Sequence, residues 1–175
     1  MKTSLFSKVF KRLVFHLIAA VFYSLAVLFF TQNIWSFLQF FIGVILGVSF
    51  TVLDEEFLAG FYQDQEIEQE PTNENLSVES SDNKFIVTQS PLYLISLIPT
   101  SIFIFTSSGS FLAMGIMGGL LLFFLVEMGK TLANPEVFYK QFFVSARFEK
   151  SKQNLERLFG GLLLFFVVLH FLVLL

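Results

Sequence analysis

The charged residues of this 175-residue chain are confined to three blocks, and the sequence between the blocks is apolar. The blocks cover residues 1–12, 54–90 and 127–157. Apolar stretches of roughly 17–25 residues are long enough to cross the hydrocarbon core of a bilayer as α-helices. Lipid offers the backbone no hydrogen-bond partner, so such segments must satisfy their own peptide groups. The sequence therefore predicts an all-α, polytopic transmembrane helical bundle.

The apolar sequence divides into about five spans, because two of its runs are interrupted by short polar breaks at 31–33 and 107–110. Breaks this short between apolar helices predict helical hairpins. The fold is then two hairpins plus one C-terminal span. The parts are a basic N-terminus (1–12), a transmembrane hairpin (13–53), an acidic loop (54–90), a second hairpin (91–126), a cytoplasmic segment with an interfacial amphipathic helix (127–157) and the last span (158–175).

The basic residues give an orientation. All 11 Lys and Arg residues lie in the three charged blocks, which five alternating spans place on one side of the membrane. The positive-inside rule makes that side cytoplasmic, with the N-terminus inside and the C-terminus outside. A cleaved signal peptide is the competing interpretation of the first 30 residues, but the apolar run exceeds the usual length and no clear cleavage site follows. Short loops favour a bacterial cytoplasmic membrane.

Two cytoplasmic segments could contact a partner. Residues 54–90 contain ten acidic residues and one Lys, a composition typical of a disordered segment. This loop is either a solvated linker or an acidic bait for a basic partner. In the third block, Asn134, Pro135 and Glu136 are typical of a helix start. We interpret the helix that follows as lying on the membrane surface, and docking onto another subunit is the alternative.

Small residues suggest where helices approach each other closely. Gly43 and Gly47 form a GxxxG motif in the second span, and Gly115 and Gly119 form another in the fourth. Small side chains let helix backbones pack at short distance within lipid. The motifs serve packing within the chain or homo-oligomerisation.

The two GxxxG spans share a further pattern, because each ends in an acid at the cytoplasmic boundary. These acids are Asp54 in the first half and Glu127 in the second. We therefore consider the hypothesis that the two hairpins arose by parallel duplication, related by an axis along the membrane normal.

Asp54, Glu55, Glu56 and Glu127 form a possible boundary carboxylate cluster, since the topology places them at one depth. Carboxylates held together can bind a hard cation such as Mg²⁺ or Ca²⁺. Ordinary boundary charge, solvated by head groups and water, is the alternative and the one we favour. No metal or cofactor is therefore expected.

The remaining residues argue against catalysis. Cysteine is absent, and no metalloprotease, nucleophile-elbow or phosphate-binding motif occurs. His16 and His170 lie at different depths, so we expect each to be a hydrogen-bonded interior residue. The charge pattern excludes a nucleic-acid partner. We expect a non-enzymatic scaffold, assembly factor or subunit of a membrane complex, with the lipid bilayer and a membrane-protein partner or second copy as its contacts. The alternative is a small oligomeric transporter or channel that uses a kink at Pro99.

Overall fold

The computed structural model describes residues 2–29, 33–54, 91–142 and 151–174. Within these ranges all regular secondary structure is helical, which confirms the predicted all-α class. The helices are α1 (Lys2–Leu28), α2 (Ile34–Leu53), α4 (Pro91–Ser107), α5 (Phe111–Thr131), α6 (Pro135–Phe142) and α7 (Lys152–Leu174).

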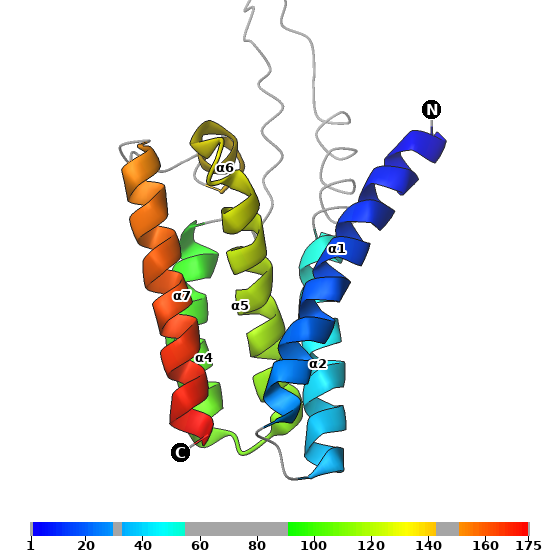
Figure 1. The fold of residues 1–175 in the computed structure, drawn as a ribbon, viewed down its shortest axis with the longest axis vertical. Coiled ribbons are helices and arrows are strands. Elements are labelled where there is room, and N and C mark those ends of the chain that lie inside the picture. The colour runs from blue at the N-terminus through cyan, green and yellow to red at the C-terminus, as the bar shows by residue number, and fades with distance from the viewer. Residues whose placement is uncertain (1, 30–32, 55–90, 143–150, 175) are drawn as a thin grey trace, which may run out of the picture.

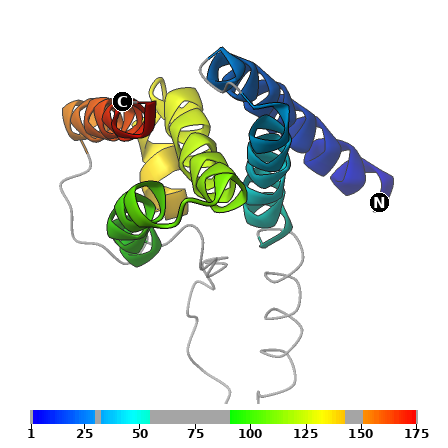
Figure 2. The ribbon, with the colours of Figure 1, turned by 90° about the horizontal axis from the view of Figure 1, so that it is seen from below.

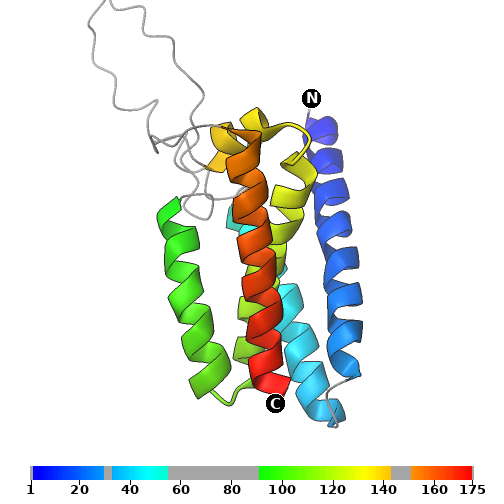
Figure 3. The same cartoon turned by 60° about the vertical axis from the view of Figure 1, so that its left-hand side comes forward.

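The long helices lie side by side and alternate in direction (Figure 1). The N-terminus and α6 lie at one end of the bundle, whereas the turn between α4 and α5 and the C-terminus lie at the other. Seen along the bundle, α2 and α5 occupy the middle, with α1 beside α2 and with α4 and α7 on the far side of α5 (Figure 2). Figure 3 shows α7 running alongside α4 and α5. The central position of α5 is reflected in its burial. Within its candidate membrane span, 67% is buried inside the structure, whereas the buried share of the α7 span is 17%.

Three of the described helices are long and apolar enough to cross a membrane. They are α2, α5 and the Lys152–Phe171 part of α7. Two shorter apolar helical segments accompany them, Arg12–Leu28 in α1 and Leu92–Ser107 in α4. The outer faces carry large apolar side chains, among them Trp35, whose exposed fraction is 71%. An apolar exterior of this kind fits association with a membrane, because lipid solvates apolar side chains.

Local capping explains where the two central helices begin. Asn33 is the N-cap of α2, and its side chain accepts a hydrogen bond from the backbone N–H of Trp35. Ser110 is the N-cap of α5 and accepts from Ala113 in the same way. The preceding Gly109 has a φ of 59°, a left-handed conformation that glycine adopts without steric cost. This turn reverses the chain between α4 and α5.

Glycines allow α2 and α5 to pack with their backbones in contact. A Cβ atom on Gly43 would overlap the backbone carbonyl of Leu112, and one on Gly47 would overlap that of Ile116. Even an alanine methyl group would therefore force the two helices apart. The close approach gives extensive dispersion contact between the two helices, the kind of packing that small residues permit.

The contact between α2 and α5 is reciprocal. Gly115 meets the carbonyl of Phe40 just as Gly43 meets that of Leu112, and Gly119 meets the carbonyl of Val44. Each α2 residue thus corresponds to the α5 residue 72 positions later, and the two parallel helices are related by a local two-fold axis along their length. Duplication of the two hairpins remains a hypothesis. It requires a two-fold relation between α2 and α5, and the glycine contacts have that symmetry.

The short helix α6 begins at Pro135 with Glu136 in its first turn, as the sequence predicted for this helix start. Its Tyr139 side chain is buried, and the hydroxyl donates to the carbonyl oxygen of Ser151 at 3.1 Å. Burial raises the pKa of the Tyr139 phenol, so the hydroxyl keeps its proton and remains a donor. The Ser151 hydroxyl accepts from the backbone N–H of Asn154, which caps the start of α7. Tyr139 thereby ties α6 to the beginning of the last helix.

Candidate functional site

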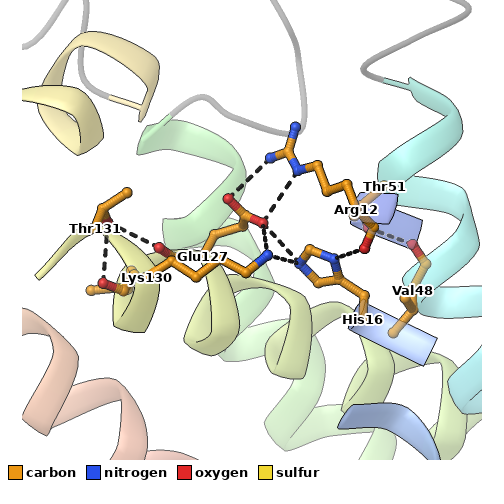
Figure 4. A network of polar contacts seen from close by, with 8 residues as sticks. Arg12, His16, Val48, Thr51, Glu127, Lys130 and Thr131 are labelled. Atoms are coloured by element: carbon orange, nitrogen blue, oxygen red, sulfur yellow. Dashed lines mark hydrogen bonds and ion pairs between the residues drawn. The ribbon is translucent and has the colours of Figure 1, made fainter. Parts of the chain in front are cut away.

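The most concentrated group of ionisable side chains in the described part of the chain lies between α1 and α5. Arg12 and His16 are four residues apart on α1, so they lie on the same face of that helix. Glu127 and Lys130 are three residues apart on α5, which likewise places them on one face of that helix. The packing of the two helices brings these faces together near the end of the bundle where the N-terminus lies (Figure 4). We call these four residues the Glu127 cluster.

The carboxylate of Glu127 is the centre of the cluster. Its Oε2 lies 3.0 Å from Nη2 of Arg12, and its Oε1 accepts a longer bond of 3.3 Å from Nε of the same guanidinium. Oε1 also lies 3.0 Å from Nζ of Lys130 and 2.8 Å from Nε2 of His16. Three basic side chains therefore surround one carboxylate (Figure 4).

Burial within the cluster is graded. The side chains of His16 and Glu127 are 1% and 6% exposed, whereas those of Arg12 and Lys130 are 24% and 34% exposed. The acid and the imidazole thus lie inside the bundle, and the Arg12 and Lys130 side chains reach its surface. A buried carboxylate is costly unless charged hydrogen-bond donors surround it, and this arrangement provides them.

Aromatic rings fix the positions of the basic groups. The His16 ring stacks on Phe123 with 4.9 Å between ring centroids. The Nζ atom of Lys130 lies 4.4 Å from the centroid of Phe15, within cation–π range. Each contact again joins α1 to α5. The cluster therefore acts mechanically as a tie between the first helix and the central helix.

A second polar pair lies deeper between the helices. The hydroxyl of Tyr23 on α1 contacts Nε2 of His170 on α7, and Nδ1 of His170 lies 2.6 Å from the carbonyl oxygen of Phe166. The Phe105 ring meets the His170 ring edge-on at 5.1 Å. Gly118 makes room for the phenol, since a Cβ there would lie 2.5 Å from the Tyr23 oxygen. This pair ties α1 to α7.

Both histidines are hydrogen-bonded, as predicted, but only His16 is fully buried, whereas His170 is partly buried. His16 bonds through Nδ1 to the carbonyl oxygen of Arg12 at 2.8 Å, and His170 bonds to Phe166 and Tyr23. The other buried polar side chains of the described core also have partners. Ser24, Thr51, Ser101 and Thr131 donate to backbone carbonyls of their own helices.

The residues singled out from the sequence fall into separate places. The four GxxxG glycines lie together in the contact between α2 and α5. Asp54 is buried at the end of α2, and Glu127 lies in its basic cluster on α5. Glu55 and Glu56 lie outside the described residues. Among the described residues, no group of three or more His, Asp or Glu side chains is arranged to hold a metal ion.

Sequence reasoning did not identify the basic partners of Glu127. Basic residues near span ends, such as Arg12 and Lys130, indicate orientation by the positive-inside rule and do not indicate a carboxylate partner. The spacing of Arg12 and His16 on one helix face was the available signal, but it does not reveal which helix that face contacts.

The fold and the cluster together define a class, the all-helical proteins with several helices capable of crossing a membrane. Comparison of the chain with known protein families, with curated proteins and with solved structures gives no match.

Proposed function

We propose that this chain is a five-span integral membrane protein that acts as a non-catalytic component of a membrane complex, as a scaffold, assembly factor or subunit. The observation that carries the proposal is the engagement of Glu127 by Arg12, His16 and Lys130 of the same chain. A carboxylate whose oxygens already accept from three basic groups holds helices together. Such a group is poorly suited to bind a hard cation or to act on a substrate.

Five spans are supported by the alternating helix directions and by the apolar segments of α1 and α4, which lie alongside the three longer candidates. The basic side chains of Arg12 and Lys130 lie near the same end of the bundle, and the positive-inside rule makes that end cytoplasmic. In this arrangement α6 lies at the cytoplasmic interface. Its buried Tyr139 faces the bundle, while Val137 is 52% exposed and available to the membrane surface.

The absence of cysteine makes the proposed topology easy to test. Ser108 lies exposed in the turn between α4 and α5, and Lys152 lies exposed at the start of α7. In intact cells, a membrane-impermeant maleimide should label Ser108→Cys at once and Lys152→Cys only after permeabilisation. The reverse pattern would invert the orientation. Labelling of both positions from the same side would contradict five alternating spans.

The functional part of the proposal is tested by gentle extraction of the tagged chain from native membranes. Mass determination and identification of co-purifying proteins then follow. A stoichiometric partner of different sequence is the expected result. A clean assembly containing only copies of this chain would contradict the subunit proposal and would favour the second candidate.

The second candidate is a small oligomeric transporter. It is favoured by one observation, namely that α1 carries two polar contacts at different depths, His16 with Glu127 and Tyr23 with His170. Ionisable residues inside membrane helices often mark substrate or proton pathways. Reconstitution into liposomes provides the test, since a transporter gives a flux that Glu127→Gln abolishes while the protein remains folded.

A further inference from the structure

The hydrogen-bond partners of the two histidines assign different protonation to their rings. At His170, Nδ1 faces the carbonyl oxygen of Phe166 at 2.6 Å. A carbonyl can only accept, so Nδ1 carries hydrogen and donates. Nε2 is then free to accept from the hydroxyl of Tyr23. A neutral imidazole satisfies both contacts.

His16 has acceptors on both sides of its ring. Nδ1 faces the carbonyl oxygen of Arg12 at 2.8 Å, and Nε2 faces Oε1 of Glu127 at 2.8 Å. An ionised carboxylate is an acceptor only, and Glu127 behaves as one because it also accepts from Arg12 and Lys130. A neutral ring has a single N–H, so in either tautomer it would leave a nitrogen lone pair facing one of these two acceptors at hydrogen-bond distance.

We propose that the assembled bundle holds one bound proton between Nε2 of His16 and Oε1 of Glu127, so that His16 is doubly protonated. The site is almost fully buried, and Phe123 stacks on the ring that carries the charge. The proton converts a contact between two acceptors into a charge-assisted hydrogen bond between α1 and α5. The bundle thus contains a proton-binding site that fastens its first helix.

The charged groups around His16 permit this assignment. Arg12 lies on α1, Lys130 lies on α5, and the titratable group at the corresponding end of α2 is Asp54. Lys130 Nζ is 3.5 Å from Nε2 of His16 and only 3.0 Å from Oε1 of Glu127, so the carboxylate is its main partner. Arg12 and Lys130 are both partly exposed, which lets solvent or head groups stabilise their charge.

The contact between α1 and α5 at this end of the bundle then depends on the proton. Removal of the proton would leave one ring nitrogen without hydrogen, facing an acceptor at a present separation of 2.8 Å on either side of the ring. The ring and the carboxylate would have to separate, and Arg12 and Lys130 alone would hold Glu127. Uptake and loss of this proton therefore couple to the position of the first helix.

The experiment uses the full chain, because its only two histidines make the spectrum simple. Nitrogen-15 magnetic resonance of labelled histidine in protein reconstituted into lipid bilayers at neutral pH should show one doubly protonated ring and one neutral ring. His170→Gln should remove the neutral signal and so assign it. Two neutral rings in the unaltered protein would overturn the proposal, because His16 would then hold no second proton.

Two variants sharpen the result. Glu127→Gln removes the anion and should convert His16 to the neutral form, while the His170 signal stays as an internal reference for a folded bundle. Lys130→Met removes a neighbouring cation and should leave His16 doubly protonated. Persistence of the doubly protonated signal in a folded Glu127→Gln protein would contradict the assigned partner. Because the unaltered chain alone shows whether the proton is present, the test does not depend on either variant folding.

Discussion

His16 on α1 and Glu127 on α5 meet with 2.8 Å between Nε2 and Oε1, and both side chains are almost completely buried. The contact joins the first helix to the central helix of the bundle, across most of the length of the chain. Around it, Arg12 of α1 and Lys130 of α5 complete a charged tie between the two helices. The expected behaviour of variants follows from this tie and from the glycine contact beside it.

Replacement of Glu127 by Gln should lower the free energy of unfolding by about 1–3 kcal/mol, because the basic side chains of Arg12, His16 and Lys130 lose their shared charged acceptor. Unfolding by denaturant in mixed micelles would measure the change. Glu156→Gln is the matched control, since Glu156 pairs with Lys152 at 3.8 Å on an exposed part of α7. An exposed pair of this kind contributes about 0–1 kcal/mol. Equal effects of the two changes would contradict the central position of Glu127.

Arg12 should matter more than Lys130 within the cluster. The Arg12 guanidinium contacts both oxygens of Glu127, whereas Lys130 contacts one oxygen and lies only three residues away on the same helix. Only Arg12 therefore links separate helices through a two-point contact. Arg12→Gln should lower the melting temperature in detergent more than Lys130→Gln does, and the opposite order would show that the tie to α1 is weak.

Gly115→Ala should destabilise the bundle by about 1–3 kcal/mol, the usual range for overpacking a close contact. The added methyl group would overlap the carbonyl of Phe40 on α2. Gly160→Ala on α7 is the control, because a Cβ at Gly160 meets nothing within 4 Å. That change should be neutral or slightly stabilising, since alanine is the better helix former. Unfolding measurements on both variants under the same conditions compare them directly.

The Tyr23 and His170 side chains should be energetically coupled. Their hydrogen bond links α1 to α7, and hydrogen bonds between membrane helices contribute about 0.6–1.7 kcal/mol. A double-mutant cycle with Tyr23→Phe and His170→Phe should return a coupling energy in that range. Additive effects of the two changes would mean that the pair contributes nothing beyond its packing.

The sequence was sufficient for the features that depend on local composition. Apolar runs and polar breaks indicated helices, and Pro135 is a helix-start residue whose role depends only on its neighbours in the chain. The GxxxG motifs identified a face of small side chains on each of α2 and α5. The motifs alone do not show whether those faces pack within one chain or between two copies.

The site could not be predicted, because hydropathy gives the depth of a residue in the membrane but not the helix it faces. Glu127 was grouped with Asp54 on the basis of depth, whereas the structure surrounds it with Arg12, His16 and Lys130. The Tyr23 contact with His170 likewise depends on the position of α7 in the bundle relative to α1, which no local pattern encodes.

The reciprocal contact between α2 and α5 has a consequence for biosynthesis. In the proposed five-span topology, synthesis from the N-terminus places α1 and α2 in the membrane before α5 has been made. During that interval the glycine face of α2 has lipid where the α5 backbone will lie, and His16 has no carboxylate opposite it. The first hairpin therefore acquires its final structure only when α5 has been inserted, and the bundle is completed late, around its central helix.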